Sequence, residues 1–216
     1  MATQITPQLL PIELNIEKKK NQVLANIIKM LTNRKLLDVD KLEENIKKIT
    51  EKISEDMLFK IKLDHPEVYN LETDVFHIKL LKHKITGLTK TTLLGEYLNT
   101  NKNPTIIVVD SITQKIHDLI KSTFKNTEIF TEKELMIDLV SHILIPKHEL
   151  NDEKVTKQLL EEYIVKKKEM PKILLNDPVT KYYNGKPGQS FSIIRPSETS
   201  GLAPYHRFIV KGITKH

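Results

Sequence analysis

The stretch Ile193-Ile194-Arg195-Pro196-Ser197-Glu198-Thr199-Ser200-Gly201 decides how this chain is interpreted. An apolar pair leads into an arginine, a proline, hydroxyl side chains with one acid, and a glycine, an order that composition bias rarely produces. Proline followed by serine and threonine predicts a turn, because these hydroxyls bond nearby backbone amides. We therefore expect a strand over residues 191–194, then a turn, and a second strand over residues 205–210.

Turn-forming residues are closely spaced throughout this part of the chain. Asn176-Asp177-Pro178-Val179, Gly185 and Pro187-Gly188 all precede the stretch above. Further upstream a helix is expected to begin at Asn151, and Pro171 ends the segment after that helix. Short strands, turns and a helix within about 75 residues predict a compact α+β domain, a size that is marginal for folding alone.

Helices alternate with strands in the first part of the chain, which predicts an α/β domain. Apolar residues recur at helical spacing over residues 16–31 and 39–53, so a pair of helices is expected there. The next elements are predicted as strands at residues 57–63, 75–81 and 105–109, and helices at residues 89–98 and 111–124. The β-branched run Thr105–Val109 is typical of a strand covered on both faces.

A long strand is expected over residues 135–145, and the boundary between two domains is placed within or just after it. Residues 1–140 then form the α/β domain and residues 141–216 the α+β domain.

The composition limits the possible functions. The chain has 216 residues, a net charge of +6 and no cysteine. Disulfides, cysteine-ligated zinc and a cysteine nucleophile are therefore excluded. No run has the length and apolar character of a membrane span, and the first residues lack the pattern of an export signal. The positive charge is compatible with a nucleic-acid neighbour, although a lysine-rich solvated surface explains it equally well.

The motifs of the C-terminal part resemble the assembly domain of the RNA polymerase subunit shared by all three eukaryotic nuclear polymerases, the fifth subunit, and of its counterpart in the archaeal RNA polymerase. The matching residues are His142 with Ile145-Pro146-Lys147-His148, Met170-Pro171-Lys172-Ile173, Asp177-Pro178-Val179 with Tyr182, Gly188, the run from Arg195 to Gly201, and Tyr205 with Arg207. The order of elements in the first half is similar to the jaw domain of the eukaryotic subunit. A divergent jaw with Lys, Ile and Asn enrichment suits a protist or a large DNA virus.

The resemblance implies a non-catalytic polymerase subunit with no cofactor, no metal and no membrane contact. Its partners would be the largest RNA polymerase subunit, other core subunits and downstream double-stranded DNA. The residues that it implies at the subunit interface are His148, Pro171, Asp177, Pro178, Arg195, Ser197, Glu198, Thr199, Gly201, Tyr205 and Arg207. Those that it implies near DNA are Thr113, Gln114 and Lys115. The expected location is the nucleus for a cellular protein, and a cytoplasmic viral factory or the virion for a viral one.

Two other functions stay open at this point. The jaw is expected to have a nuclease-like fold without activity. A magnesium-dependent nuclease would use Asp64 and Lys79. Histidine at position 77, however, replaces the second carboxylate that such a site needs. A free-standing transcription adaptor would use the C-terminal domain without joining the enzyme.

His142 and His148 are interpreted as partly buried, hydrogen-bonded residues rather than metal ligands. Arg195 and Glu198 are expected either to hold the turn or to bind the partner subunit, and both roles stay open.

Overall fold

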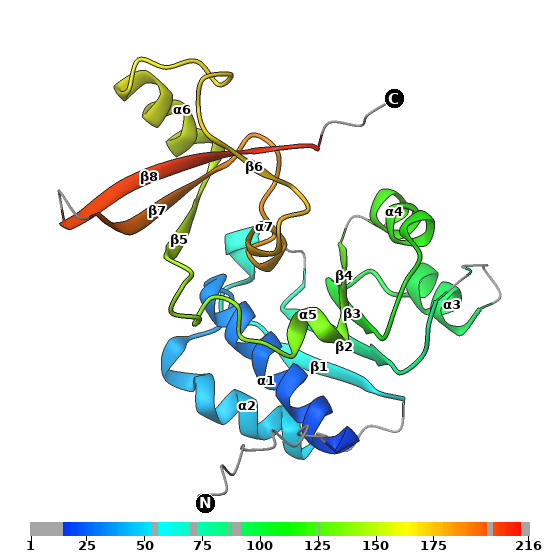
Figure 1. Ribbon diagram of the computed structural model, residues 1–216. Helices are drawn as coiled ribbons and strands as arrows, with labels where there is room; N and C mark the ends of the chain where they lie inside the picture. The colour runs from blue at the N-terminus through cyan, green and yellow to red at the C-terminus, as the bar shows by residue number, and fades with distance from the viewer. Residues whose placement is uncertain are drawn as a thin grey trace, which may run out of the picture.

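The computed structural model describes residues 15–52, 56–69, 73–85, 87, 92–124, 126–197 and 201–212. It contains two four-stranded sheets, one formed before residue 140 and one after it (Figure 1). In the described part of the chain, no helix is both long enough and apolar enough to cross a membrane.

A helical pair opens the fold. Helix α1 (Ile16–Asn33) buries a stripe at helical spacing, and after the 3₁₀ turn η1 (Val39–Lys41) helix α2 (Leu42–Glu51) packs against it. The chain reverses at Lys35, whose φ of 62° lies in the left-handed region. The two expected helices are confirmed, except that the second begins as a 3₁₀ turn and the expected residue 53 lies outside the described residues.

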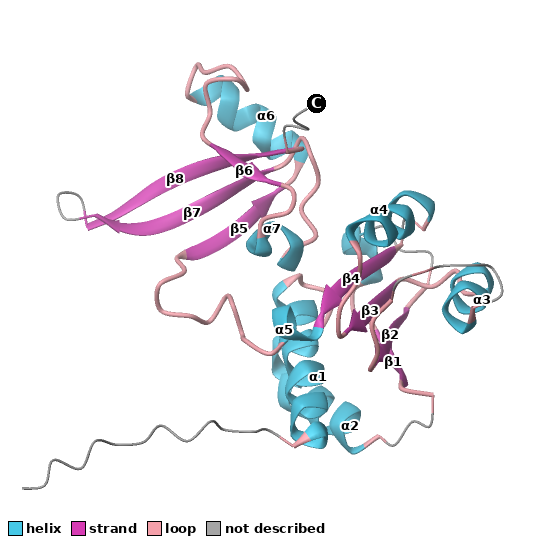
Figure 2. Ribbon diagram, turned by 45° about the vertical axis from the view of Figure 1, so that its right-hand side comes forward, coloured by secondary structure: helices cyan, strands magenta, loops and turns pink. Residues whose placement is uncertain are grey.

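The first sheet has the order β1-β2-β3-β4. Strand β1 (Leu58–Lys62) is antiparallel to β2 (Val75–Leu81), and β3 (Thr105–Val109) and β4 (Thr127–Thr131) continue the sheet in parallel. Alternate residues point to opposite faces, so Ile106 and Val108 face the core with α1, whereas Ile107 and Val109 face the helices α3 (Leu93–Thr100) and α4 (Gln114–Thr123). Figure 2 shows α3 and α4 beside one face of this sheet and α1 beside the other.

Burial of all five residues of β3 confirms the strand covered on both faces. Strand β4 was missed by the sequence analysis, because its Thr-Glu-Ile-Phe-Thr pattern carries too few apolar residues to stand out.

The prediction of a strand over residues 135–145 is wrong. Thr131 and Glu134 form a capping box that starts the short helix α5 (Glu132–Leu135). Residues 136–146 contain only turns, stabilised locally where the Ser141 hydroxyl donates to Asp138 at 2.8 Å. Ile143 and Leu144, counted toward a strand, are 95% and 81% exposed. Apolar composition misled the prediction, because no neighbouring strand is available there to pair with.

The second sheet has the order β5-β7-β8-β6. Strands β5 (Lys147–Asn151), β7 (Ser190–Ser197) and β8 (Gly201–Val210) are antiparallel neighbours, and β6 (Lys172–Leu174) pairs in parallel with the end of β8. Helix α6 (Glu153–Glu162) contacts one face of this sheet, where the Thr156 and Ser190 hydroxyls lie 3.0 Å apart. Helix α7 (Pro178–Tyr182) and Tyr183 lie on the other face, where Tyr183 meets Phe191 edge-on.

One hydrophobic core joins the two halves of the molecule. Tyr182, Tyr183, Phe191, Ile193 and Ile209 of the second half belong to the same buried cluster as α1 and the strands β1 to β4. The fold is therefore a mixed α/β structure in which the two sheets share packing. The boundary between residues 140 and 141 stays a prediction.

Candidate functional site

Strands β7 and β8 form a hairpin that extends beyond its neighbours in the sheet. Strand β5 pairs only with residues 190–194 of β7, and β6 pairs only with residues 208–210 of β8. Residues 195–197 of β7 therefore pair with β8 alone, and residues 201–207 of β8 pair with β7 alone; we call these two stretches the free half of the hairpin. Figure 1 shows this part of the hairpin projecting away from the rest of the fold. Neither β5 nor β6 covers the free half of the hairpin, so a partner can reach it.

One face of the free half carries two arginines around a tyrosine. Tyr205 is half-buried, and the guanidinium carbons of Arg195 and Arg207 lie 4.7 and 5.6 Å from the centre of its ring. Both arginines are exposed. Cations over an aromatic face attract it electrostatically, and arginine and tyrosine are enriched among the residues that dominate binding energy at interfaces. The structure thus brings three of the predicted interface residues together.

The opposite face of the free half is apolar and exposed. Pro196 is paired with Leu202, and Ile194, which directly precedes the free half, is paired with Pro204, so these four side chains share a face. All four are exposed, Leu202 by 70%. Exposed apolar side chains that cluster in this way often mark an interaction surface.

The outer edge of β8 is protected from pairing by Pro204. The backbone N–H of Phe208 donates to Pro171 on the side of β6, and since strand residues alternate, residues 202, 204 and 206 direct their backbone groups to the same outer side. Proline at such a position removes a donor from the free edge, which is where sheets tolerate it and where it discourages unwanted strand addition. Contact through side chains is therefore better suited to this hairpin than addition of a strand.

The remaining predicted interface residues have mainly local structural roles. Asp177 caps α7 by accepting a hydrogen bond from the Val179 N–H at 2.9 Å, and Pro178 occupies the first turn of that helix. Pro171 supplies the carbonyl that receives the Phe208 N–H at 2.7 Å. Ser197 and Gly201 flank the tip of the hairpin, and Gly201 has a φ of 71°. Glu198 and Thr199 lie outside the described residues, so the expected contact of Arg195 with Glu198 stays a prediction.

His148 lies half-buried on β5. Its Nδ1 lies 2.6 Å from the Pro146 carbonyl oxygen, to which it donates, and its ring meets Phe191 edge-on. Burial lowers the pKa of His148 and the nearby Arg207 guanidinium acts in the same direction, whereas the hydrogen bond to Pro146 and the Asp177 carboxylate oppose the shift. His142 is hydrogen-bonded as predicted, since it accepts from the Leu144 N–H at 3.2 Å. The prediction that it is partly buried is wrong, because its side chain is exposed.

The lowered pKa of His148 predicts a pH dependence. A folded-state pKa below the unfolded value near 6.5 means that stability is fully present above pH 6.5 and is lost as the pH falls toward the folded pKa. We expect the free energy of unfolding to fall between pH 7 and pH 5 in the native protein, and to fall less in His148→Gln. Urea titrations at a series of pH values measure this difference, which is at most about 1.4 kcal/mol per pH unit for one proton. Equal pH slopes in both proteins would contradict the assignment.

The residues implied to lie near DNA sit at the start of α4. Thr113 is the N-cap residue, and Gln114 and Lys115 form the first turn of this ten-residue helix. All three are exposed, and the Gln114 amide donates to Asp118 at 3.0 Å. A helix N-terminus carries unpaired N–H groups and a partial positive charge, which suits a phosphate.

The residues of the nuclease alternative do not form a site. Asp64 accepts hydrogen bonds from the Lys41 ammonium at 2.7 Å and the Asp38 N–H at 3.1 Å, and the bond from Lys41 holds its pKa below the usual range. Lys79 is paired with Leu58 at the far end of β1, and its ammonium lies 4.4 Å from the centre of the Tyr97 ring. Across the described ranges, no cluster of His, Asp and Glu side chains could hold a metal ion.

A junction that the sequence did not predict connects the two halves. The Arg34 side chain is 1% exposed, and its two terminal nitrogens each donate to one Glu128 carboxylate oxygen at 2.7 Å. Its Nε donates to the Tyr182 carbonyl at 2.7 Å, and the amide of Asn33 donates to the Tyr182 hydroxyl at 2.8 Å. Burial raises the pKa of Tyr182. An isolated arginine after a helix carries no pattern from which this role could be predicted.

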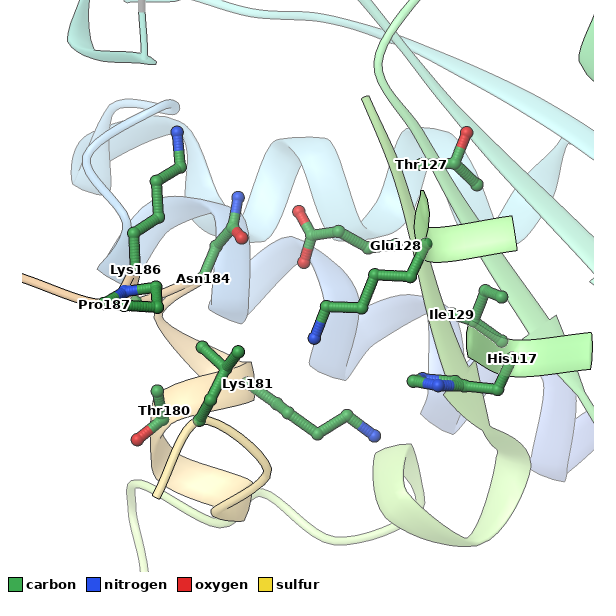
Figure 3. A pocket seen from close by; sticks show the side chains of 12 residues that line it. His117, Thr127, Glu128, Ile129, Thr180, Lys181, Asn184, Lys186 and Pro187 are labelled. Carbon is green, nitrogen blue, oxygen red and sulfur yellow. The ribbon is translucent and has the colours of Figure 1, made fainter. Parts of the chain in front are cut away.

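A pocket lies beside this junction, between α4 and β4 on one side and α7 with the following loop on the other. It encloses about 370 Å³ and is lined by His117, Lys121, Thr127, Glu128, Ile129, Leu175, Thr180, Lys181, Asn184, Gly185, Lys186 and Pro187. In Figure 3, Glu128, Lys181 and His117 extend into the gap, while Lys186 and Asn184 stand on the rim. A Cβ on Gly185 would lie 2.6 Å from the Ile209 side chain, so glycine lets this loop pack closely against the sheet.

The comparisons with known proteins decide the family. Residues 137–209 match the family described as RNA polymerase Rpb5, C-terminal domain. The chain is 30% identical over 195 residues to DNA-directed RNA polymerase subunit 5 of Acanthamoeba polyphaga mimivirus, which covers 87% of this chain and 90% of the viral protein. The chain belongs to the RNA polymerase subunit 5 family.

Cellular relatives within the subunit 5 family match shorter parts of the chain. The subunit rpabc1 of DNA-directed RNA polymerases I, II and III from Dictyostelium discoideum is 35% identical over 109 residues, 49% of this chain and 55% of its own length. The archaeal subunit Rpo5 from Methanococcoides burtonii is 38% identical over 72 residues, which is 92% of that protein but 33% of this chain. The archaeal protein is thus matched nearly in full by one third of this chain, and the family resemblance seen in the sequence is confirmed.

Proposed function

We propose that this chain is a non-catalytic subunit of a DNA-directed RNA polymerase. In this role its C-terminal part docks on the largest subunit and its first part forms a side of the channel for downstream DNA. The observation that carries the proposal is membership of the subunit 5 family over most of the chain, with a relative that is itself named as a polymerase subunit. The nuclease alternative is disfavoured, because Asp64 and Lys79 contact other partners, Lys41 and Tyr97, and not each other.

The free half of the hairpin supports docking through the C-terminal part. It projects from the fold and presents the Arg195–Tyr205–Arg207 face and an apolar face at the same time. Interfaces commonly combine buried aromatic and arginine anchors with apolar packing. Docking on the largest subunit, and a division into a jaw with a nuclease-like fold and an assembly domain, follow from the family resemblance.

The proposed location depends on the source of the protein. Nuclear polymerase subunits among the relatives fit a nuclear location, and the mimivirus relative fits a viral factory or the virion.

Affinity purification of the tagged full chain from its native source tests the function. Large polymerase subunits in equal amounts, with primer-extension activity in the eluate, are expected. A chain that elutes without polymerase subunits would contradict the proposal. Polymerase subunits present in substoichiometric amounts, and lost at moderate salt, would favour the free-standing adaptor instead.

Contact with DNA is expected at the start of α4. A lysine meets a phosphate as a point charge, so its removal weakens binding to all sequences alike and reduces the salt dependence. We expect Lys115→Ala to lower retention of the assembled polymerase on a duplex template and to reduce the salt slope by about one. Retention should be measured across a salt series, with Lys154→Ala on α6 as the control. An unchanged slope in Lys115→Ala would rule out a phosphate contact at this position.

A further inference from the structure

We propose that the pocket between α4 and α7 is a binding site for a phosphate group that both halves of the molecule hold together. This inference stands apart from the proposed polymerase role, because it rests on the lining of the pocket alone. The lining is drawn from both halves: His117 and Lys121 come from α4 in the first, and Lys181 and Lys186 come from α7 and the loop after it in the second.

The volume and shape of the pocket suit a small anion. About 370 Å³ lies within the range of ligand pockets and exceeds what a single phosphate needs, so a di- or triphosphate also fits. The walls also contain apolar side chains, Ile129 and Leu175 among them, next to which fewer water molecules can screen a charge than in bulk solvent. Charges attract more strongly where water is partly excluded.

The charges in the pocket are unbalanced in favour of an anion. Among the described lining residues the one carboxylate is Glu128, and both of its oxygens already accept from the buried Arg34 guanidinium at 2.7 Å. Lys181 forms an ion pair with Glu134 outside the lining. Within the described ranges, neither Lys121 nor Lys186 forms an ion pair, although Asp118, one turn before Lys121 on α4, interacts with it electrostatically and lies 3.3 Å from His117 Nδ1. These two lysines, on opposite sides of one cavity, provide the charge that a phosphate would neutralise.

The basic side chains of the pocket come from different elements. His117 and Lys121 are one helical turn apart and therefore share a face of α4, the face that lines the pocket. Lys181 extends from α7 across the gap, and Lys186 stands on the rim (Figure 3). Lysine side chains are long and rotatable, so their ammonium groups can converge on a ligand that bridges the gap. Arg34 connects the two walls, because it donates to Glu128 on β4 and to the Tyr182 and Lys181 carbonyls on α7.

Binding of tripolyphosphate to the full chain, measured by isothermal titration calorimetry, tests the site. Lys121→Ala/Lys186→Ala removes the two pocket lysines that form no ion pair in the described part of the chain. Lys154→Ala/Lys157→Ala on the exposed surface of α6 removes the same charge elsewhere and serves as the matched control. We expect the pocket variant to bind at least tenfold more weakly than the native protein and the control to bind normally. Lys121→Arg/Lys186→Arg should restore binding, which separates loss of charge from misfolding. Equal affinities of the pocket and control variants, or no binding by the native chain, would overturn the proposal.

Competition identifies the source of the phosphate. A labelled DNA duplex that is displaced by tripolyphosphate, and bound more weakly by the pocket variant, would assign the site to a nucleic-acid backbone. A duplex that binds the pocket variant and the native chain equally, while tripolyphosphate binding is lost, would assign it to a free polyphosphate or nucleotide. Both results support a phosphate site.

Discussion

Arg34→Ala should destabilise the protein by about 3 kcal/mol, because it removes one partner of a largely buried ion pair. The Arg34 side chain is 1% exposed, whereas that of Glu128 is 21% exposed, so water can solvate part of the carboxylate that is left behind. The loss is therefore expected at the lower end of the range for buried pairs. The Tyr182 and Lys181 carbonyls also lose a charged donor, which adds to the cost.

Urea unfolding of the full chain measures this effect. Lys48→Ala is the matched control, since Lys48 pairs with Glu44 at 2.6 Å on the exposed surface of α2 and such pairs contribute about 0.5 kcal/mol or less. Arg34→Lys should lie between the two, because lysine keeps the charge but cannot donate to both carboxylate oxygens. A second unfolding transition in Arg34→Ala would show that the junction joins two separable units. A loss as small as that of the control would refute the structural role of this pair.

Arg195→Ala/Tyr205→Ala should weaken association with the polymerase by at least about thirtyfold, the effect of losing one strong anchor residue of an interface. The expected cause is the loss of the stacked cation and ring, whose centres lie 4.7 Å apart on the projecting hairpin. Arg195 is exposed and lies where β5 no longer pairs with β7, so its removal should leave the fold intact.

Co-purification with the largest polymerase subunits at several salt concentrations measures this association. Tyr205→Phe keeps the ring and should assemble normally, and Lys154→Ala/Lys157→Ala controls for the change in charge. Circular dichroism and thermal unfolding should show that the double variant remains folded. Assembly of the folded double variant at the native level would remove this face of the hairpin from the interface.

Strands were predictable from the sequence where local residue pattern determines them, and not where pairing with a distant strand does. The strand Val75–Leu81 and the strand Thr105–Val109 were predicted with the bounds that the structure shows, because their apolar, β-branched side chains are a local signal. Residues 135–145 carry a similar apolar composition but form turns, because a capping box and the lack of a neighbouring strand outweigh it. Strand β4 was not predicted, because its sequence has no strand pattern. It forms a strand because it lies beside β3 and pairs with it.

The sequence by itself determined the family, the helical pair at the start, and the two strands on either side of the Arg195–Gly201 run, although β7 extends to Ser197 and β8 begins at Gly201, beyond the expected bounds. These features depend on local propensity and on motifs that are read in order along the chain. The tertiary structure alone decided that Arg195 and Arg207 stack on Tyr205, that Arg34 joins the two halves through Glu128 and Tyr182, and that α4 and α7 enclose a basic pocket. The physical reason is separation along the chain: Arg34 lies 94 residues from Glu128 and 148 from Tyr182, and no local pattern encodes which distant charges will meet once a shared core has formed.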